Sequence, residues 1–253
     1  MHWIALKTLV LRECTVILRF WSVTLAPPII TTILYFTIFG EIIGGRIGSV
    51  EGVDYIQYLA PGLVVLWVIP YAYGHTAAGF LGARHFRYVE ELVVAPLPGW
   101  IGVLGYVLGG MIRGILVGMV ALATAMLFTH IKVHSVFTSA AVVCVAALVS
   151  ALSGFITALF ASSFDQVTTI QTLILTPLMY VGGVFNPVAT LPNWAQGLSL
   201  LNPMFYTVSA LRYGFLGISD VNFAMAFFTM CASGLTLFVA AVLLIARGVG
   251  IRE

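Results

Sequence analysis

Long apolar segments constrain this sequence more than any other feature. A helix that crosses a lipid bilayer needs about 20 predominantly apolar residues. Soluble domains are about 25% charged, whereas this chain of 253 residues is 61% hydrophobic and only 8% charged. The sequence therefore predicts an all-α membrane protein, a single domain over residues 1–253 with six transmembrane helices. The predicted spans are residues 23–43, 60–81, 100–127, 136–161, 167–185 and 223–246.

The distribution of Lys and Arg predicts the orientation of these spans. Cytoplasmic loops are enriched in Lys and Arg, and an even number of spans puts both termini on one side. The opposite side would hold only Arg46, Lys132 and Arg212. We therefore expect both termini in the cytoplasm, and a net charge of +2 argues against nucleic acid as a partner. The side of the termini would hold Lys7, Arg12, Arg19, Arg84, Arg87, Arg247 and Arg252.

Residues 1–21 have the pattern of an amphipathic helix rather than of a span. Polar side chains such as Arg12 and Arg19 fall on one side of this helix. A helix of this kind, with tryptophan at both ends, suits the membrane interface; packing on another soluble element is the alternative. The apolar face consists of Trp3, Leu6, Val10, Cys14, Ile17 and Trp21.

The connection at residues 82–99 carries an unusual share of the charge. No helix breaker occurs between Arg84 and Val94, and Pro96 and Pro98 then end the predicted helix. Arg87 can pair with Glu90 or Glu91 at helical spacing. From the spacing alone, this helix is either a solvated connector or an element that docks on a partner.

The region after the fifth predicted span, residues 186–217, is rich in proline and glycine. The stretch at residues 203–216 is helical in pattern but too short to cross a bilayer. Irregular backbone at membrane depth must be shielded by protein or by a water-filled cavity. We therefore expect a re-entrant helical hairpin on the outer side. We interpret the pairs Asn186–Pro187 and Asn202–Pro203 as helix caps, each followed by proline at the first helical position.

Arg113 is the one charged residue deep inside a predicted span. Ionisable residues at this depth are costly and usually face the bundle interior or a cavity, so we expect an inward-facing structural or pathway role. Glycines beside it allow neighbouring helices to approach closely. These glycines are Gly109, Gly110, Gly114 and Gly118.

The sequence holds no coherent catalytic set and no metal site. His130 and His134 are spaced by four, but the intervening Glu of a metalloprotease is absent. The three cysteines are far apart, and we expect them to be small buried hydrophobic residues. No Gly-x-x-x-x-Gly-Lys-Ser/Thr loop occurs, so the chain cannot cradle ATP in that way. We therefore expect a protein that is not an enzyme.

Three stretches give the chain a resemblance to a known family. They are "YLAPGLVV" at residues 58–65, "VEELVVAPLP" at residues 89–98, and the segment from "LTPLMYVGG" to "LRYGFLG" at residues 175–217. Together they resemble the permease subunits of type-2 ABC exporters, the class that exports polysaccharides, lipids and drugs from bacteria. The second stretch is similar to the family pattern Glu-x-Leu-Leu-x-x-Pro, with Val93 in place of the second leucine.

The resemblance implies a dimer of permeases that works with two copies of a separate ABC ATPase, which would bind the ATP and Mg²⁺; this chain would hold no cofactor. The loop at residues 82–99 would hold a cytoplasmic coupling helix that docks on the ATPase. The first and fifth spans of both copies would line the substrate path. The implied coupling residues are Arg87, Glu90, Glu91, Leu92, Val93 and Pro96. The path candidates are Tyr35, Phe36, Phe39, Tyr180 and Phe185, and Arg113 is included with them.

The function that we expect is therefore that of an export permease in the inner membrane, in contact with lipid. An ion-gradient-driven transporter is the first alternative, but it needs titratable groups near the middle of the membrane. Only Arg113 is predicted there, and arginine does not release its proton. An intramembrane enzyme is the second alternative. The sequence does not distinguish glycan, lipid and drug substrates.

Overall fold

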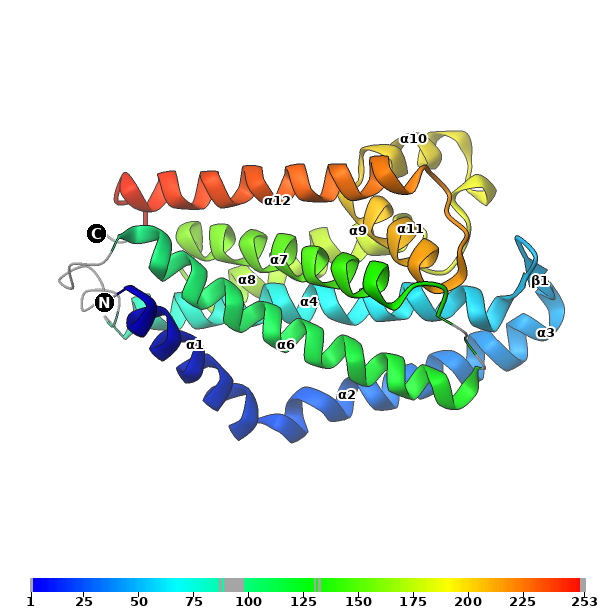
Figure 1. Ribbon diagram of the computed structural model, residues 1–253, viewed down its shortest axis with the longest axis horizontal. Helices are drawn as coiled ribbons and strands as arrows, with labels where there is room; N and C mark the ends of the chain where they lie inside the picture. The colour runs from blue at the N-terminus through cyan, green and yellow to red at the C-terminus, as the bar shows by residue number, and fades with distance from the viewer. Residues whose placement is uncertain (1, 87, 89–97, 130, 132, 251–253) are drawn as a thin grey trace.

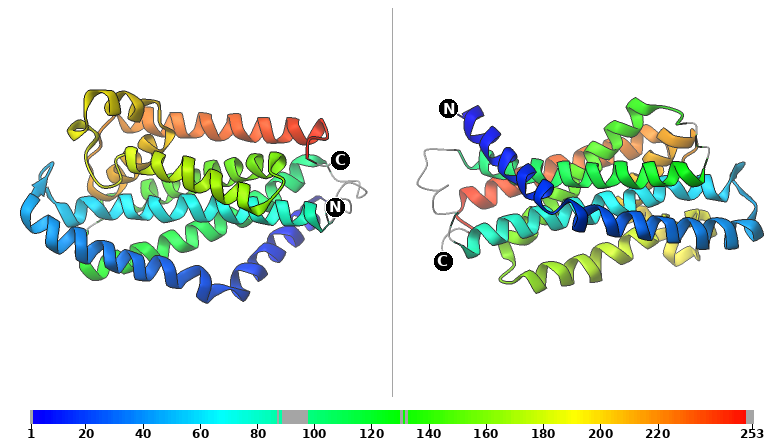
Figure 2. Two further views of the ribbon diagram at one scale, coloured as in Figure 1. Left: turned by 180° about the vertical axis from the view of Figure 1, so that it is seen from behind. Right: turned by 90° about the horizontal axis from the view of Figure 1, so that it is seen from below.

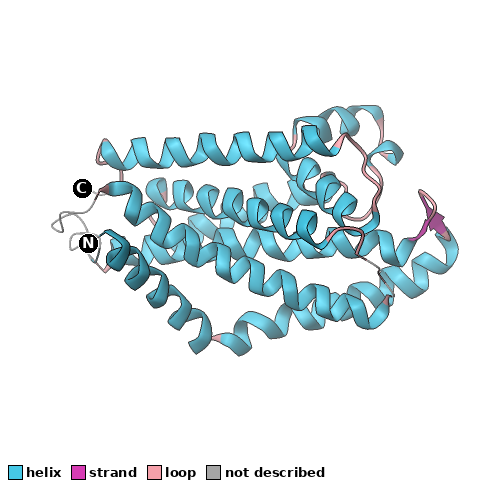
Figure 3. Ribbon diagram, in the orientation of Figure 1, coloured by secondary structure: helices cyan, strands magenta, loops and turns pink. Residues whose placement is uncertain are grey.

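The computed structural model describes residues 2–86, 88, 98–129, 131 and 133–250, and these form a bundle of helices with one short β-hairpin (Figures 1 and 3). The hairpin pairs β1 (Ser49–Val50) with β2 (Val53–Asp54). The helical elements, in chain order, are α1 (His2–Arg19), α2 (Trp21–Tyr35), the π-helix η1 (Phe36–Ile43), α3 (Gly44–Ile47), α4 (Tyr55–His85), α6 (Gly99–Phe128), α7 (Val136–Phe160), α8 (Phe164–Ile170), the π-helix η2 (Gln171–Leu175), α9 (Thr176–Val181), the 3₁₀ helix η3 (Val188–Thr190), α10 (Asn193–Leu201), α11 (Pro203–Leu216) and α12 (Phe223–Ala246).

Among the described residues, five helices are long and apolar enough to cross a membrane. The all-α membrane fold predicted from the sequence agrees with them. Each corresponds to a predicted span, and the second extends beyond its predicted limits at both ends. The five are Trp21–Arg46, Tyr55–His85, Gly99–Phe128, Val136–Phe160 and Phe223–Ala246.

The remaining predicted span, residues 167–185, corresponds to a helix in three successive pieces, α8, η2 and α9. This helix ends at Val181, and Gln166 and Gln171 reduce its apolar character. It is not among the five helices above, so a sixth crossing stays a prediction. Figure 2 shows that it nevertheless lies along the bundle beside α4.

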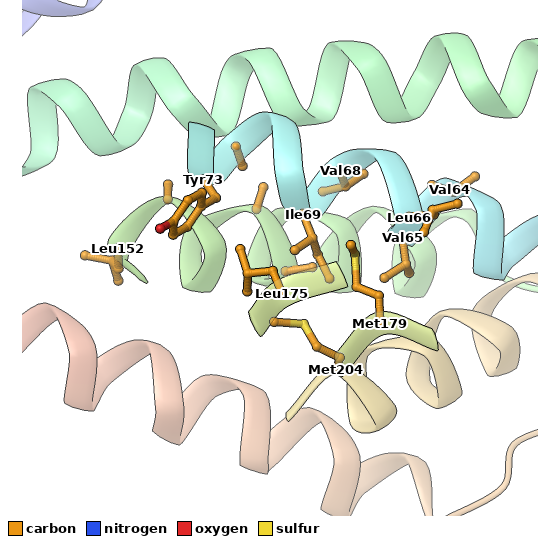
Figure 4. Close-up of a cluster of buried hydrophobic side chains, with 14 of the residues drawn as sticks. Val64, Val65, Leu66, Val68, Ile69, Tyr73, Leu152, Leu175, Met179 and Met204 are labelled. Carbon is orange, nitrogen blue, oxygen red and sulfur yellow. The ribbon is translucent and has the colours of Figure 1, made fainter. Parts of the chain in front are cut away.

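Helix α4 forms the centre of the bundle, because most of its side chains are buried on all sides. It packs against α6 and α7, and its buried valines and isoleucine meet Leu152, Leu175, Met179 and Met204 from neighbouring helices (Figure 4). This apolar layer fixes the positions of the helices that carry the candidate site.

Glycines allow the close packing around α4 that the sequence predicted. A β-carbon at Gly114 would lie 2.9 Å from the carbonyl oxygen of Val68 and 2.8 Å from Cβ of Ala72. A β-carbon at Gly110 would overlap the Thr76 side chain, and one at Gly118 would overlap Val68. Helix α6 therefore lies directly on α4 through glycines at every fourth position.

Helix α1 packs on α6 and ends at a bend at Phe20. Its residues Ile4, Leu11 and Leu18 recur every seventh position and are 69%, 54% and 70% exposed. An exposed apolar stripe on a surface helix is consistent with the predicted interfacial location, which stays a prediction. On the predicted apolar face, Ile17 is buried while Trp3 is exposed.

The segment predicted to form a re-entrant hairpin contains η3, α10 and α11, at the end of the bundle away from the start of α1 and the end of α12 (Figure 1). Asn202 caps α11 as predicted, because its side chain accepts a hydrogen bond from the Met204 amide and Pro203 is the first helical residue. The predicted Asn186 cap is wrong, because η3 begins only at Val188 and Pro187 precedes it. Re-entry into a membrane stays a prediction.

The prediction of three buried cysteines is also wrong for two of them. Cys144 on α7 and Cys231 on α12 are exposed, and Cys14 is half-buried. Both exposed cysteines lie on helices that are apolar enough to span a membrane, so an apolar side chain can face outward there without contact with water.

Candidate functional site

The predicted coupling residues lie outside the described residues. These are Arg87, Glu90, Glu91, Leu92, Val93 and Pro96. The residues around them are described: α4 ends at His85 and α6 begins at Gly99, both at the end of the bundle where α1 starts and α12 ends (Figure 1). Phe86 and Tyr88 are 66% and 53% exposed there.

Arg84 anchors the last turn of α4 to the end of α7. Its Nη1 atom donates to the carbonyl oxygens of Ala158, Leu159 and Ala161, at 2.7, 3.2 and 3.0 Å. The last carbonyls of a helix have no partner inside the helix, and a cation at that end is also favoured by the helix dipole. Arg84 therefore fixes the position of the connection between α7 and α8 relative to the last residues before the predicted coupling helix.

Four of the predicted path residues come together in one aromatic cluster. Tyr35 lies at the end of α2 and Phe39 in η1, while Tyr180 lies in α9 and Phe185 follows it. The Phe185 ring centre is 5.5 Å from Tyr35, 5.2 Å from Phe39 and 5.5 Å from Tyr180. The Tyr35 and Phe39 ring centres are 5.8 Å apart. The first and fifth predicted spans therefore meet at an aromatic surface.

This aromatic cluster is only partly covered by the rest of the chain. Tyr180 is 47% exposed, and Tyr35, Phe39 and Phe185 are half-buried. Aromatic rings offer large apolar faces, while the tyrosine hydroxyls can also form hydrogen bonds. Such a surface can contact an amphipathic molecule or the aromatic side chains of a second copy.

The other two path candidates lie apart from this cluster. Phe36 is buried and stacks on Phe128 of α6, with ring centres 5.5 Å apart and an interplanar angle of 6°. Arg113 points toward α4 and α2, where it contacts His75 and Thr24. The inward-facing position that the sequence predicted for Arg113 agrees with these contacts. A role of either residue in the path stays a prediction.

Both helices that carry the aromatic cluster contain a π-helical segment. η1 directly follows Tyr35, and η2 lies one turn before Tyr180. A π-helical segment carries hydrogen bonds from residue i+5 to residue i, is uncommon, and often occurs at functional sites. In both helices the segment changes which side chains face the cluster.

The end of the bundle next to α10 and α11 is held by a buried arginine. Arg212 is 0% exposed, and its guanidinium group contacts Asp220 and donates to the carbonyl oxygen of Gly183 at 2.8 Å. The same group lies 3.9 Å from the centre of the Tyr58 ring. These contacts tie α11 to the turn after α9 and to the first turn of α4. Because Gly183 lies two residues before Phe185, they also restrict the position of Phe185.

Two charged or titratable groups in the bundle were not recognised from the sequence. Glu13 on α1 is 4% exposed and His75 on α4 is 6% exposed. His75 Nε2 lies 3.0 Å from Glu13 Oε2, and His75 Nδ1 lies 3.1 Å from Arg113 Nη1. A signal was present in the sequence, because Glu13 falls beside the apolar face of its helix and His75 lies within a predicted span.

The pKa of Glu13 is set by opposing effects. Burial alone would raise it, but the neighbouring His75 and Arg12 side chains outweigh burial and hold the pKa below its ordinary value. Glu13 therefore remains ionised at neutral pH. Its second partner, Arg12, approaches to 2.7 Å through Nη2.

A separate pocket of about 670 Å³ lies where η1, the β-hairpin, the start of α4 and the end of α6 meet. Asp54, Gln57 and Thr129 contribute polar groups to its lining, and several glycines form one wall. In the part of the chain that the structure describes, no three His, Cys, Asp or Glu side chains are grouped so that they could hold a metal ion.

Comparison with known proteins finds a family match that covers most of the chain. The model of the ABC-2 type transporter family matches residues 4–216. The chain is 43% identical over 254 residues to the inner membrane transport permease YadH of Escherichia coli (strain K12), across 100% of this chain and 99% of the relative. It is 27% identical over 224 residues to nodulation protein J of Sinorhizobium fredii, across 88% of this chain and 84% of the relative. It is 26% identical over 218 residues to nodulation protein J of Rhizobium leguminosarum bv. viciae, across 85% of this chain and 83% of the relative.

Proposed function

The chain belongs to the ABC-2 type transporter family, and we propose that it forms the substrate path of an ATP-driven exporter as a dimer. The family match supports a membrane subunit of an ABC transporter. The observation that carries the finer proposal is the half-exposed aromatic cluster where the first and fifth predicted spans meet. In the proposed dimer, these clusters of the two copies face a common path.

The proposed energy source is a separate ABC ATPase, present in two copies, which binds ATP and Mg²⁺. The chain has no phosphate-binding loop of the Gly-x-x-x-x-Gly-Lys-Ser/Thr type. Closure of the ATPases on ATP would push on the coupling helix at residues 82–99. Arg84 would pass this movement to the end of α7 and the start of α8, which leads to Tyr180.

In this proposal, the permease lies in the inner membrane with both termini in the cytoplasm. The excess of Lys and Arg on the side of the termini supports that orientation. The pocket at Asp54 and the helices α10 and α11 then lie on the outer side. The apolar and aromatic character of the path candidates suits an amphipathic cargo, such as a lipid-linked or glycan molecule, better than a small ion.

One observation favours a second function, that of a transporter driven by an ion gradient. Glu13 and His75 are titratable and buried between helices beside Arg113, which supplies groups that the sequence-based prediction lacked. The two functions differ in their energy source, so transport measured without ATP or without a proton gradient distinguishes them. Export that stops when ATP is removed, and continues when an ionophore dissipates the proton gradient, supports the ATP-driven function.

The coupling assignment is tested by reversing one charge in the predicted docking helix. Glu90→Arg should abolish co-purification of the permease with its ATPase, or leave ATP hydrolysis that no longer drives export, because a repulsive charge would face the docking groove. Glu51→Arg, on the hairpin at the opposite end of the bundle, is the matched control and should change neither property. If Glu90→Arg leaves association and export unchanged, the docking assignment is wrong.

A further inference from the structure

A continuous chain of polar contacts crosses four helices inside the bundle. It begins with Glu13 on α1, whose carboxylate oxygen Oε2 lies 3.0 Å from His75 Nε2 on α4. His75 Nδ1 lies 3.1 Å from Nη1 of Arg113 on α6. Nη2 of the same guanidinium group donates to Thr24 Oγ1 on α2 at 2.9 Å. This Glu13–His75–Arg113–Thr24 chain links α1 to α2 across α4 and α6. It is a second connection between the two helices, besides the covalent one through the bend at Phe20.

The contacts fix the protonation pattern of the histidine. A guanidinium group has only donors, so Nδ1 of His75 must accept the hydrogen bond from Arg113. The imidazole proton is then on Nε2, which lies 3.0 Å from Glu13 Oε2 in a polar contact that lacks the alignment of a hydrogen bond. His75 is therefore a neutral bridge between a cation and an anion, and removal of either neighbour leaves a buried polar group without a partner.

The shape of α6 allows α1 to reach this position. A β-carbon at Gly109 would lie 2.6 Å from Cβ of Glu13, and one at Gly105 would lie 2.8 Å from Cδ1 of Leu9. Glycines at these two positions let α1 lie close enough to α6 for the Glu13 side chain to pass over it to His75. Such close approach makes the contact between Glu13 and His75 a specific feature of this packing rather than a surface contact.

The fully buried residues of α2 and η1 form a single row that faces the bundle. The buried residues of α2 and η1 recur every fourth position, and most of the large apolar side chains between them are exposed. Thr32 in this row accepts a hydrogen bond from Trp67 Nε1 at 2.9 Å, which makes it the second polar attachment besides Thr24. The row consists of Thr24, Pro28, Thr32, Phe36 and Gly40.

Two prolines follow the Arg113 contact directly. Pro27 and Pro28 lie inside α2 and have no N–H group, so they cannot donate to the carbonyls of Val23 and Thr24. Missing backbone hydrogen bonds at consecutive positions make this part of α2 the place where the helix bends most easily. The side chain of Thr24 thus attaches the short segment before the bend, while Thr32 attaches the segment after it.

We propose that the Glu13–His75–Arg113–Thr24 chain is a positioning device that holds the α2 segment before Pro27 and Pro28 against the bundle and ties its position to α1. This inference rests on the proposed function, in which α2 borders the substrate path. When the Glu13–His75–Arg113–Thr24 contacts are intact, α1 and the start of α2 move as one unit with α4 and α6. These two helices lie on either side of the predicted coupling helix. When it is broken, α2 pivots at the prolines and the path no longer follows the ATPase.

Distances within one copy test the proposal. We would replace the three native cysteines by serine and attach spin labels at Val23→Cys, which is exposed on the α2 segment before the prolines, and at Met119→Cys on α6. The labelled chain would be reconstituted in nanodiscs of phosphatidylethanolamine and phosphatidylglycerol. Dilution with unlabelled chain restricts the measured distances to one copy. Thr24→Val removes the acceptor and keeps the branched shape. The control Thr37→Val removes a hydroxyl on the same continuous helix that bonds only to its own turn, at the Ile33 carbonyl.

Thr24→Val should add a second distance population, with about a tenfold change in the ratio of the two populations, as expected for the loss of a hydrogen bond to a charged group. Thr37→Val should give the parent distribution. His75→Leu should act like Thr24→Val, whereas His75→Gln should restore the parent distribution, because an amide can accept from Arg113 and donate to Glu13. An unchanged distribution in Thr24→Val overturns the proposal.

A second measurement separates this proposal from the proposed function. The same variants would be combined with the ATPase, and ATP-dependent changes in the distance would be recorded. If the ATPase does not associate with the parent chain, the exporter function fails while the distance result still decides the positioning role. If it associates, Thr24→Val should lose at least half of the ATP-dependent distance change while ATP hydrolysis continues. If Thr24→Val shows the same ATP-dependent change in the label distance as the parent, the Glu13–His75–Arg113–Thr24 contacts do not link α2 to the ATPase.

Discussion

At the scale of single residues, Arg212 shows how a buried charge can hold a membrane protein together. A charge without a partner inside a protein or membrane is costly, so it is stable there only when its neighbours satisfy it. Arg212 has a carboxylate, a backbone carbonyl and an aromatic ring around it, from three separate parts of the chain. Its side chain therefore fixes the arrangement of α11, the turn after α9 and the start of α4.

Replacement of this arginine should destabilise the whole chain. Arg212→Gln leaves Asp220 without its cation in a buried place and removes the contact with Tyr58, so we expect a loss of about 3–5 kcal/mol. Thermal unfolding of the purified chain in detergent, followed by size-exclusion chromatography, measures this loss. Arg247→Gln, at an exposed position at the end of α12, is the control, and equal stability of the two variants would refute the structural role of Arg212.

Sequence reasoning found Arg113 but not its partners. Arg113 was conspicuous because it is a lone charge in an apolar segment. Glu13 lies in a short helix with several other charges, where a carboxylate next to Arg12 suggests a solvated pair. Only the crossing of α1 over Gly109 shows that Glu13 faces His75. Such a contact joins residues far apart in the chain and leaves no periodic pattern.

At the scale of helices, the spans that were predicted best are those with uniform apolar composition and clear ends. Helix α12 has the predicted limits, α7 ends one residue before its predicted limit, and α6 extends one residue further at each end. The ends of the second span were predicted less well, because α4 continues beyond the apolar run at both ends, and the π-helical segments in the first and fifth spans were not predicted. Hydrophobic periodicity indicates a helix but does not register one additional residue in a turn.

The glycines of α6 give a prediction at this scale. Gly114→Ala should force α6 away from α4, because the added methyl group would meet the Val68 carbonyl and the Ala72 side chain. Overpacking of this kind costs about 1–3 kcal/mol. Gly102→Ala is the matched control on the same helix, since a methyl group there has no neighbour within 4 Å, and better helix propensity should leave it as stable as the parent or more stable.

Denaturation in detergent, with the two variants measured side by side, decides the outcome. The expected order of stability is Gly102→Ala, then the parent chain, then Gly114→Ala. If Gly114→Ala is as stable as Gly102→Ala, then α6 does not lie on α4 as closely as described above.

At the scale of the molecule, α2 and η1 expose a large apolar surface on the side away from the bundle. Ile30, Leu34 and Ile38 are 58%, 52% and 44% exposed there. Lipid can cover such a surface, but the family membership and the neighbouring aromatic cluster favour a second copy of the chain. Because only one row of α2 and η1 is fully buried within one copy, the second copy of the proposed dimer would supply further packing of α2.

Cross-linking between copies tests that arrangement. In a chain whose native cysteines are replaced by serine, Leu34→Cys should form a covalent dimer under mild oxidation in native membranes, because the first spans of the two copies meet in the proposed dimer. Val239→Cys on α12, which is 47% exposed, should remain monomeric. Cross-linking at Val239 and not at Leu34 would place the interface on α12 and would contradict the proposed path between the copies.

The contact made by Arg84 has a consequence for the whole molecule. Arg84 and Ala158 are separated by 74 positions in the chain but are joined by one hydrogen bond. A displacement of the last turn of α4 therefore reaches the end of α7 and the turn before α8 directly, without travelling along α6 or the length of α7. One guanidinium group thus gives a short route through the molecule from the end of α4 to α8, the helix that leads toward the aromatic cluster.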